Sequence, residues 1–124
     1  MLYAILAYHD EKLIVSMSAQ EDAALMADLM RAHDRINEKA KLGPAARLDF
    51  TGEAVTLRDG PDRPVTDGPF AETKEQLLGF YVVDVETPEQ AVEAARELRR
   101  VNPTAVYEIR PIRTFLPGTV PERQ

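Results

Sequence analysis

The chain has 124 residues and a mass of 13.9 kDa, a length that fits one domain with a substantial core and excludes two. Its 21 acidic and 15 basic side chains give a net charge of −6, which argues against a general nucleic-acid-binding protein because an acidic surface repels phosphate. The absence of cysteine excludes a thiol nucleophile, a disulfide scaffold and thiolate metal sites.

The first predicted element is a strand over residues 2–8, with apolar side chains on both faces, as in a strand that is covered on both sides. Ser18 and Glu21 have the spacing of a capping box and predict a helix from about Ala19 to Lys41, ended by Gly43-Pro44. The polar residues of this helix, Asp22 among them, are assigned mainly to its solvated face. Its expected buried stripe consists of Leu25, Met26, Leu29, Met30, His33, Ile36 and Ala40.

Short β segments alternate with turns in the middle of the chain. The expected strands are 46–49, 54–58 and 63–66, and the expected turns are 51–53, 59–62 and 67–69. Pro64 has no N–H to donate to a ladder, so the strand that contains it should lie at an edge. In the last turn, the Asp67 carboxylate can accept hydrogen bonds from its own downstream backbone amides.

The C-terminal half has the clearest pattern. Residues 77–85 form the strongest predicted strand, again apolar on both faces except at Asp84. Thr87-Pro88-Glu89-Gln90 begins a second helix, with Thr87 as the cap, and Asn102-Pro103 ends it. The expected buried stripe of this helix is Ala91, Val92, Ala95, Leu98 and Val101. A last strand covers residues 105–112, and residues 114–124 form a tail.

The element order, β-α-β-β-(short β)-α-β, predicts an α+β domain over residues 1–113 with a ferredoxin-like fold. Two helices of this size cover only one face of a four- or five-stranded antiparallel sheet. The apolar side chains on the other face therefore predict a homodimer that closes sheet face to sheet face around a shared interior. The alternative is a monomer in which residues 63–76 and the tail cover that face.

His33 is the first candidate catalytic residue. It lies in the apolar stripe of the first helix and should face the sheet or its edge. A neutral imidazole there could act as a general base near neutral pH. The alternative is a histidine at the edge of the core that donates to a backbone carbonyl.

The segment from Val65 to Gln76 supplies the other candidates. Phe70 can anchor the loop in an apolar slot, while Glu72, Lys74 and Glu75 place two acids and one base within four residues. In a dimer cavity, Lys74 would lower the pKa of a neighbouring carboxyl group, and burial would raise it. The alternative is a solvated charged turn with a structural Phe70.

Tyr81, Glu108 and Arg110 are the remaining polar groups on predicted strands. Together they could form the polar floor of a pocket. Glu108 and Arg110 share a face, and an ion pair between them at a half-exposed edge is the simpler interpretation.

Cofactor and membrane signatures are absent from the sequence. It has no spacing of metal ligands, no glycine-rich phosphate loop and no dinucleotide fingerprint, so no cofactor is expected. No apolar run approaches the roughly 20 residues of a membrane span, and the first residues lack a basic segment and a cleavage site. We therefore expect a cytoplasmic protein.

The segment VTDGPFAETKEQLLGFYVVDV, with the TPEQAVEAARE helix and the YEIRPI strand after it, closely resembles the YCII-related family in its DGPF-motif branch. The resemblance spans Met1–Arg113 and implies a ferredoxin-like domain that dimerises into an α/β barrel. Relatives include small isomerases, dehalogenating or dehydrochlorinating enzymes and monooxygenases that need no metal or flavin. The family's usual catalytic proposal is a His–Asp pair in the inter-subunit cleft. Asp67 matches the motif aspartate, with Phe70, Glu72, Lys74 and Glu75 as its companions, whereas residues 19–25, where relatives hold the histidine, contain none.

Two functions follow from the residues and the resemblance, and a purely structural dimer, which needs no site, is the third alternative. The first is a lyase or isomerase that abstracts a proton from a small molecule. His33 or Glu72 would be its base, Asp67 would orient, and Lys74 or Arg110 would stabilise the developing anion. The second is a non-catalytic dimeric module that binds a small ligand or a protein. Its protein partner could be a sigma factor, since the resemblance implies accessories encoded beside extracytoplasmic-function sigma factors.

Overall fold

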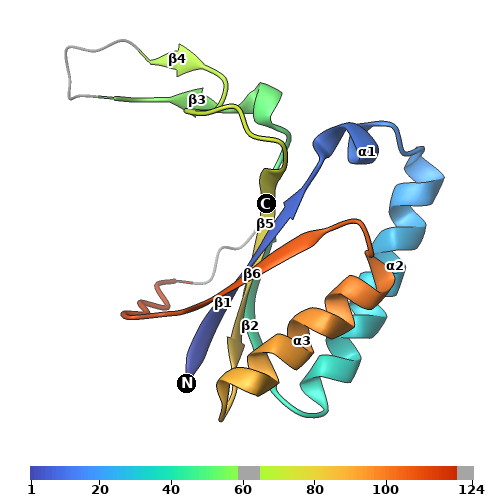
Figure 1. Cartoon of the computed structure of the whole chain (residues 1–124), viewed down its shortest axis with the longest axis vertical. Coiled ribbons are helices and arrows are strands. Elements are labelled where there is room, and N and C mark those ends of the chain that lie inside the picture. Colours follow the sequence, from blue (N-terminus) through green and yellow to red (C-terminus); the bar gives the residue numbers. More distant parts are fainter. Residues whose placement is uncertain (59–64, 120–124) are drawn as a thin grey trace.

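A four-stranded antiparallel sheet with two long helices on one face forms the body of the molecule (Figure 1). The computed structural model describes residues 1–58 and 65–119. The strands are β1 (Leu2–His9), β2 (Lys41–Arg47), β5 (Gln76–Asp84) and β6 (Val106–Pro111), and the helices are α1 (Glu11–Val15), α2 (Ala19–Asn37) and α3 (Pro88–Val101). The strand order β2-β5-β1-β6 is compatible with the ferredoxin-like fold expected from the sequence.

The predicted helix starts are confirmed at both long helices. The Ser18 hydroxyl accepts from the backbone N–H of Glu21, and the Glu21 carboxylate accepts in return from Ser18. Thr87 and Gln90 form the same reciprocal pair at the start of α3, with Pro88 in the first turn. Each box satisfies backbone donors that a helix start otherwise leaves free, so it fixes where α2 and α3 begin.

The core lies between the two helices and the sheet. Ile5, Val83 and Leu98 are its largest fully buried side chains. The predicted stripes are correct at most positions, but Met30 is 55% exposed and Val92 is 37% exposed. Ala32 and Ala94 are buried instead, because small side chains allow α2 and α3 to pack closely against each other and the sheet.

The predicted end of the first helix is wrong. Helix α2 ends at Asn37, and its side-chain Oδ1 accepts from the backbone N–H of Leu42 at 3.0 Å, where β2 has already begun. Gly43-Pro44 therefore lies inside a strand. β2 is an edge strand, and its pairing with β5 shifts register between Leu42 and Ala45, so the missing N–H of Pro44 is tolerated.

Two short strands, β3 (Val55–Thr56) and β4 (Thr66–Asp67), form a hairpin that projects from one end of the main sheet (Figure 1). The strand predicted over residues 54–58 is thus reduced to two residues. The turn predicted at 59–62, and residues 63 and 64 of the next predicted strand, lie outside the described residues. Residues 112–119 belong to no helix or strand, and 120–124 also lie outside the described residues.

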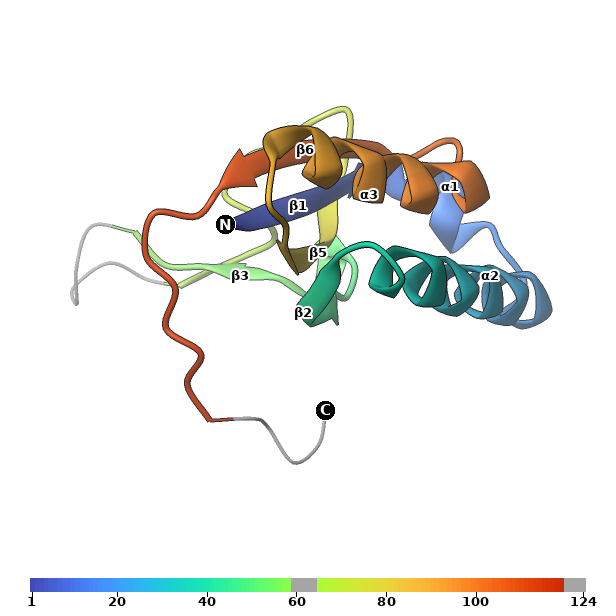
Figure 2. The same cartoon turned by 90° about the horizontal axis from the view of Figure 1, so that it is seen from below.

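The face of the sheet opposite the helices carries apolar side chains. Leu6 lies directly across from Phe80, and Ala4 lies across from Val82. Leu6 and Phe80 are only half-buried. Both helices lie on the other side of the sheet, and within the described residues no helix covers this face (Figure 2). We call it the open face.

Candidate functional site

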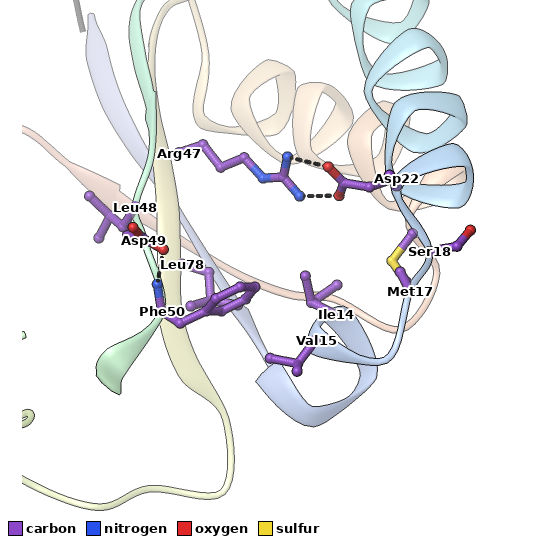
Figure 3. Close-up of a pocket in the computed structure, with 11 residues that line it drawn as sticks. Ile14, Val15, Met17, Ser18, Asp22, Arg47, Leu48, Asp49, Phe50 and Leu78 are labelled. Carbon is purple, nitrogen blue, oxygen red and sulfur yellow. Dashed lines mark hydrogen bonds and ion pairs between the residues drawn. The ribbon is translucent and has the colours of Figure 1, made fainter. Parts of the chain in front are cut away.

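A pocket of about 520 Å³ lies where α1 and the start of α2 meet the end of β2 (Figure 3). More than half of the residues that line it are apolar, namely Ile14, Val15, Met17, Ala19, Leu48, Phe50 and Leu78. Phe50 and Leu78 point from the sheet side toward Ile14 and Val15 of α1 (Figure 3). The volume lies within the range of small-molecule sites, which are concave and mostly apolar with a few polar groups.

A set of hydrogen bonds ties α1 to the loop after β2, two segments that carry residues of the pocket lining. The Glu11 carboxylate accepts from the Thr51 backbone N–H at 3.1 Å and from the Thr51 hydroxyl. The Glu11 backbone N–H donates to Oε1 of Gln76 at 3.0 Å, at the start of β5. Helix α1 was not predicted. It begins at Glu11 and is capped by Asp10, whose carboxylate accepts from the backbone N–H of Lys12.

Arg47 and Asp22 form the polar part of the pocket (Figure 3). The guanidinium donates twice, from Nη2 to Oδ1 at 2.5 Å and from Nη1 to Oδ2 at 3.1 Å. These bonds lower the pKa of the Asp22 carboxyl group and raise that of Arg47. The cross-strand neighbour of Arg47 is Gly79, where a Cβ would lie only 2.9 Å from the Ala46 carbonyl oxygen.

His33 lies on the same side of the sheet, three turns further along α2. Its ring meets that of Tyr81 edge-on, with 5.3 Å between the ring centroids. Its Nε2 is buried, and none of the described residues offers it a hydrogen bond. Burial raises the pKa of Tyr81, while the positive charge of Arg47 lowers it. The Tyr81 hydroxyl therefore interacts electrostatically with the cation that lines the pocket. His33 therefore faces the sheet as predicted, although it does not line the pocket.

We expect the pKa of His33 to lie below the ordinary value of 6.5, because burial lowers it more than the charge of Asp34 raises it. As the pH falls below about 6.5, the unfolded chain then binds a proton before the folded chain does. The free energy of unfolding should fall with pH in this window and level off once folded His33 is protonated. Urea unfolding across this range, compared with His33→Gln, measures the effect, which the variant should lack. An identical pH dependence in both proteins would contradict the placement of His33.

The motif residues lie elsewhere. Asp67 ends β4 and is exposed, so this chain does not bring it together with His33. The turn after it is held by Gly68, whose N–H donates to the Ala54 carbonyl at 2.7 Å and whose positive φ of 93° suits glycine. Phe70 is 75% exposed, so among the described residues of one chain it does not anchor the loop in an apolar slot as expected.

The charged residues after the motif are mostly solvated. Glu72 and Lys74 are exposed, and Glu75 is half-buried. Among the described residues, no ion pair joins Lys74 to either glutamate. These three side chains remain candidates only where a second molecule approaches them.

Glu108 and Arg110 form the predicted ion pair, with 2.8 Å between Arg110 Nη2 and Glu108 Oε2. The Tyr8 hydroxyl donates to the other Glu108 oxygen at 3.3 Å. Glu108 lies opposite Leu6, and so the pair belongs to the open face, whereas Tyr81 faces the helices. The three polar groups expected on one pocket floor thus lie on opposite faces of the sheet.

The described residues contain neither a cluster of metal ligands nor a membrane-spanning helix. Within residues 1–58 and 65–119, no three histidine, aspartate or glutamate side chains come close enough to share a metal ion. No helix in these ranges is both long enough and apolar enough to cross a membrane.

Comparison with known proteins assigns the family. Residues 1–116 match the model of the YCII-related domain. A protein of Rhizobium meliloti (strain 1021), described as uncharacterized, is 46% identical over 123 residues, which are 98% of this chain and 99% of the relative. The family model and the relative both align with nearly the whole chain, including the α1–α2 segment and β2, which build the pocket. The chain therefore belongs to the family of YCII-related domain proteins.

Proposed function

We propose that this protein binds a small molecule in the pocket between α1 and β2, and that it does so as a homodimer. The observation that carries the proposal is a water-accessible cavity of about 520 Å³ in which a cation, Arg47, lies beside a wall of apolar side chains. Val15, Leu48 and Phe50 line it and are between 36% and 60% exposed. A bound molecule would remove this apolar surface from water.

The open face supports the dimer. Its central pair, Leu6 and Phe80, is apolar and half-buried, and a second copy of the same face would cover it. The Asp67-Gly68-Pro69-Phe70 sequence supports placing the chain in the DGPF-motif branch, in which the resemblance implies a dimeric α/β barrel.

Mapping of small-molecule probes by NMR on the full-length protein tests the ligand site. We expect amide shifts from a fragment library to cluster at Ile14, Leu48 and Phe50. The charged groove between the C-terminal half of α2 and α3, lined by residues such as Arg35, Glu38 and Glu93, provides an internal control. Shifts that are confined to this groove, or absent from the pocket, would contradict the proposal.

A lyase or isomerase that acts by proton transfer is the second candidate. The observation that favours it is the buried Nε2 of His33, which has no hydrogen-bond partner among the described residues, together with burial that lowers the pKa of the imidazole. An NMR titration of the His33 ring in the wild type and in Asp67→Asn tests this candidate. A change of about one pKa unit would couple the two residues through the dimer, and an unchanged value would remove the His–Asp pair.

A further inference from the structure

The Asp22 carboxylate accepts two hydrogen bonds from the Arg47 guanidinium, as the carboxylate of a bound ligand would. We propose that the pocket recognises the carboxylate of a small organic acid, which replaces Asp22 on the guanidinium of Arg47. This inference rests on the proposed small-molecule site and adds the chemical class of its ligand. The planar fork of arginine matches a carboxylate with two parallel hydrogen bonds, and the Asp22 pair already shows that two-bond geometry.

Replacing Asp22 with a ligand carboxylate costs little free energy, because the Asp22–Arg47 ion pair is partly exposed to water. The Arg47 side chain is 47% exposed and that of Asp22 is 37% exposed. Ion pairs with this degree of exposure contribute little net stability. Displaced Asp22 would also keep a favourable position, since it lies in the first turn of α2, where the helix dipole stabilises negative charge.

The lining favours a monoanion with an apolar body. Arg47 is the single cation among the described residues that line the pocket, and Asp22 and Asp49 are also present, so a doubly charged phosphate would meet repulsion. Arg47 pairs with Asp22 and not with Asp49, whose Oδ1 accepts from the Phe50 backbone N–H at 2.8 Å. Val15, Leu48 and Phe50 would contact the apolar part of the acid.

The test compares 3-phenylpropanoate with its neutral amide, 3-phenylpropanamide, by NMR titration of the full-length protein. We expect the acid to shift the pocket amides and to bind at least tenfold more tightly than the amide. Arg47→Gln should abolish that preference. Arg47→Lys keeps the charge without the fork and should weaken binding of the acid, which keeps the test usable if the glutamine variant folds poorly.

Asp22→Asn removes the charged competitor and should tighten binding of the acid about two- to fivefold, which is the fold-change that corresponds to a weak exposed ion pair. Asp28→Asn is the matched control. Asp28 lies on the same helix, pairs with Arg31 and does not line the pocket, so its loss changes the net charge equally. Its affinity for the acid should equal that of the wild type.

The outcomes separate the two proposals. Equal binding of acid and amide at the pocket would overturn carboxylate recognition and leave the small-molecule site intact. Weaker or unchanged binding in Asp22→Asn would also overturn it. Shifts outside the pocket with both probes, or no shifts with either, would overturn both proposals.

Discussion

Leu98→Ala should lower the free energy of unfolding by about 2–5 kcal/mol. Leu98 is fully buried on α3 and packs in the core with Ile5 and Val83 of the sheet. Truncation removes apolar contacts and leaves a cavity, because Leu98 is closed in by the buried residues of the core, which relax only partly around a smaller side chain. Urea denaturation followed by circular dichroism measures the loss.

Val92→Ala is the matched control for this prediction. Val92 lies on the same helix but is 37% exposed, so its truncation should cost less than about 1 kcal/mol. Equal losses from the two variants would contradict the orientation of α3 in the structure.

The elements that the sequence predicted well are those fixed by local chemistry. The boxes at Ser18 and Thr87 satisfy helix donors within a few residues, and the strand over residues 77–85 combines β-branched and aromatic residues. The four-stranded antiparallel sheet with two helices follows from the order of these elements, and the structure agrees with it.

The end of α2 could not be predicted because its cause is not local. Gly43-Pro44 has the composition of a helix stop, and nothing nearby shows that β5 will pair with residues 41–47. The residues of β5 that pair with β2 lie 32 to 43 positions further along the chain. Once it is in place, an edge position with a register shift accommodates the proline, and the chain must leave the helix earlier, at Asn37.

The candidate site was only partly predictable for the same reason. Asp22 was assigned to the solvated face of its helix, and its partner Arg47 is 25 residues away. No rule of sequence spacing predicts that a residue at the start of a helix will pair with a residue at the end of an edge strand. One weak signal was available, since an aspartate in the first turn of a helix is well placed beside any cation brought there by the fold. The DGPF motif lies on the hairpin, whereas the pocket lies beside α1. The sequence pattern did not predict α1, and so it did not predict the pocket.

Phe80→Glu should convert the proposed homodimer into a monomer. Phe80 lies at the centre of the open face, directly across from Leu6, and a glutamate there would be buried without a partner when two copies meet. Each unpaired buried charge costs several kcal/mol, and a two-fold interface would contain two of them. Because ~4 kcal/mol corresponds to a ~1000-fold change in affinity, the dissociation constant of the dimer should rise by three orders of magnitude or more.

Light scattering coupled to size exclusion measures the mass of each variant. In a monomer the new carboxylate faces water, so its circular dichroism spectrum should match that of the wild type. Leu116→Glu is the control, because Leu116 in the tail is 83% exposed and should leave the dimer unchanged. A monomeric wild type, or a Phe80→Glu protein that stays dimeric, would remove the open face as the interface. The pocket would remain, because the described residues of α1, α2 and β2 within one chain already build it.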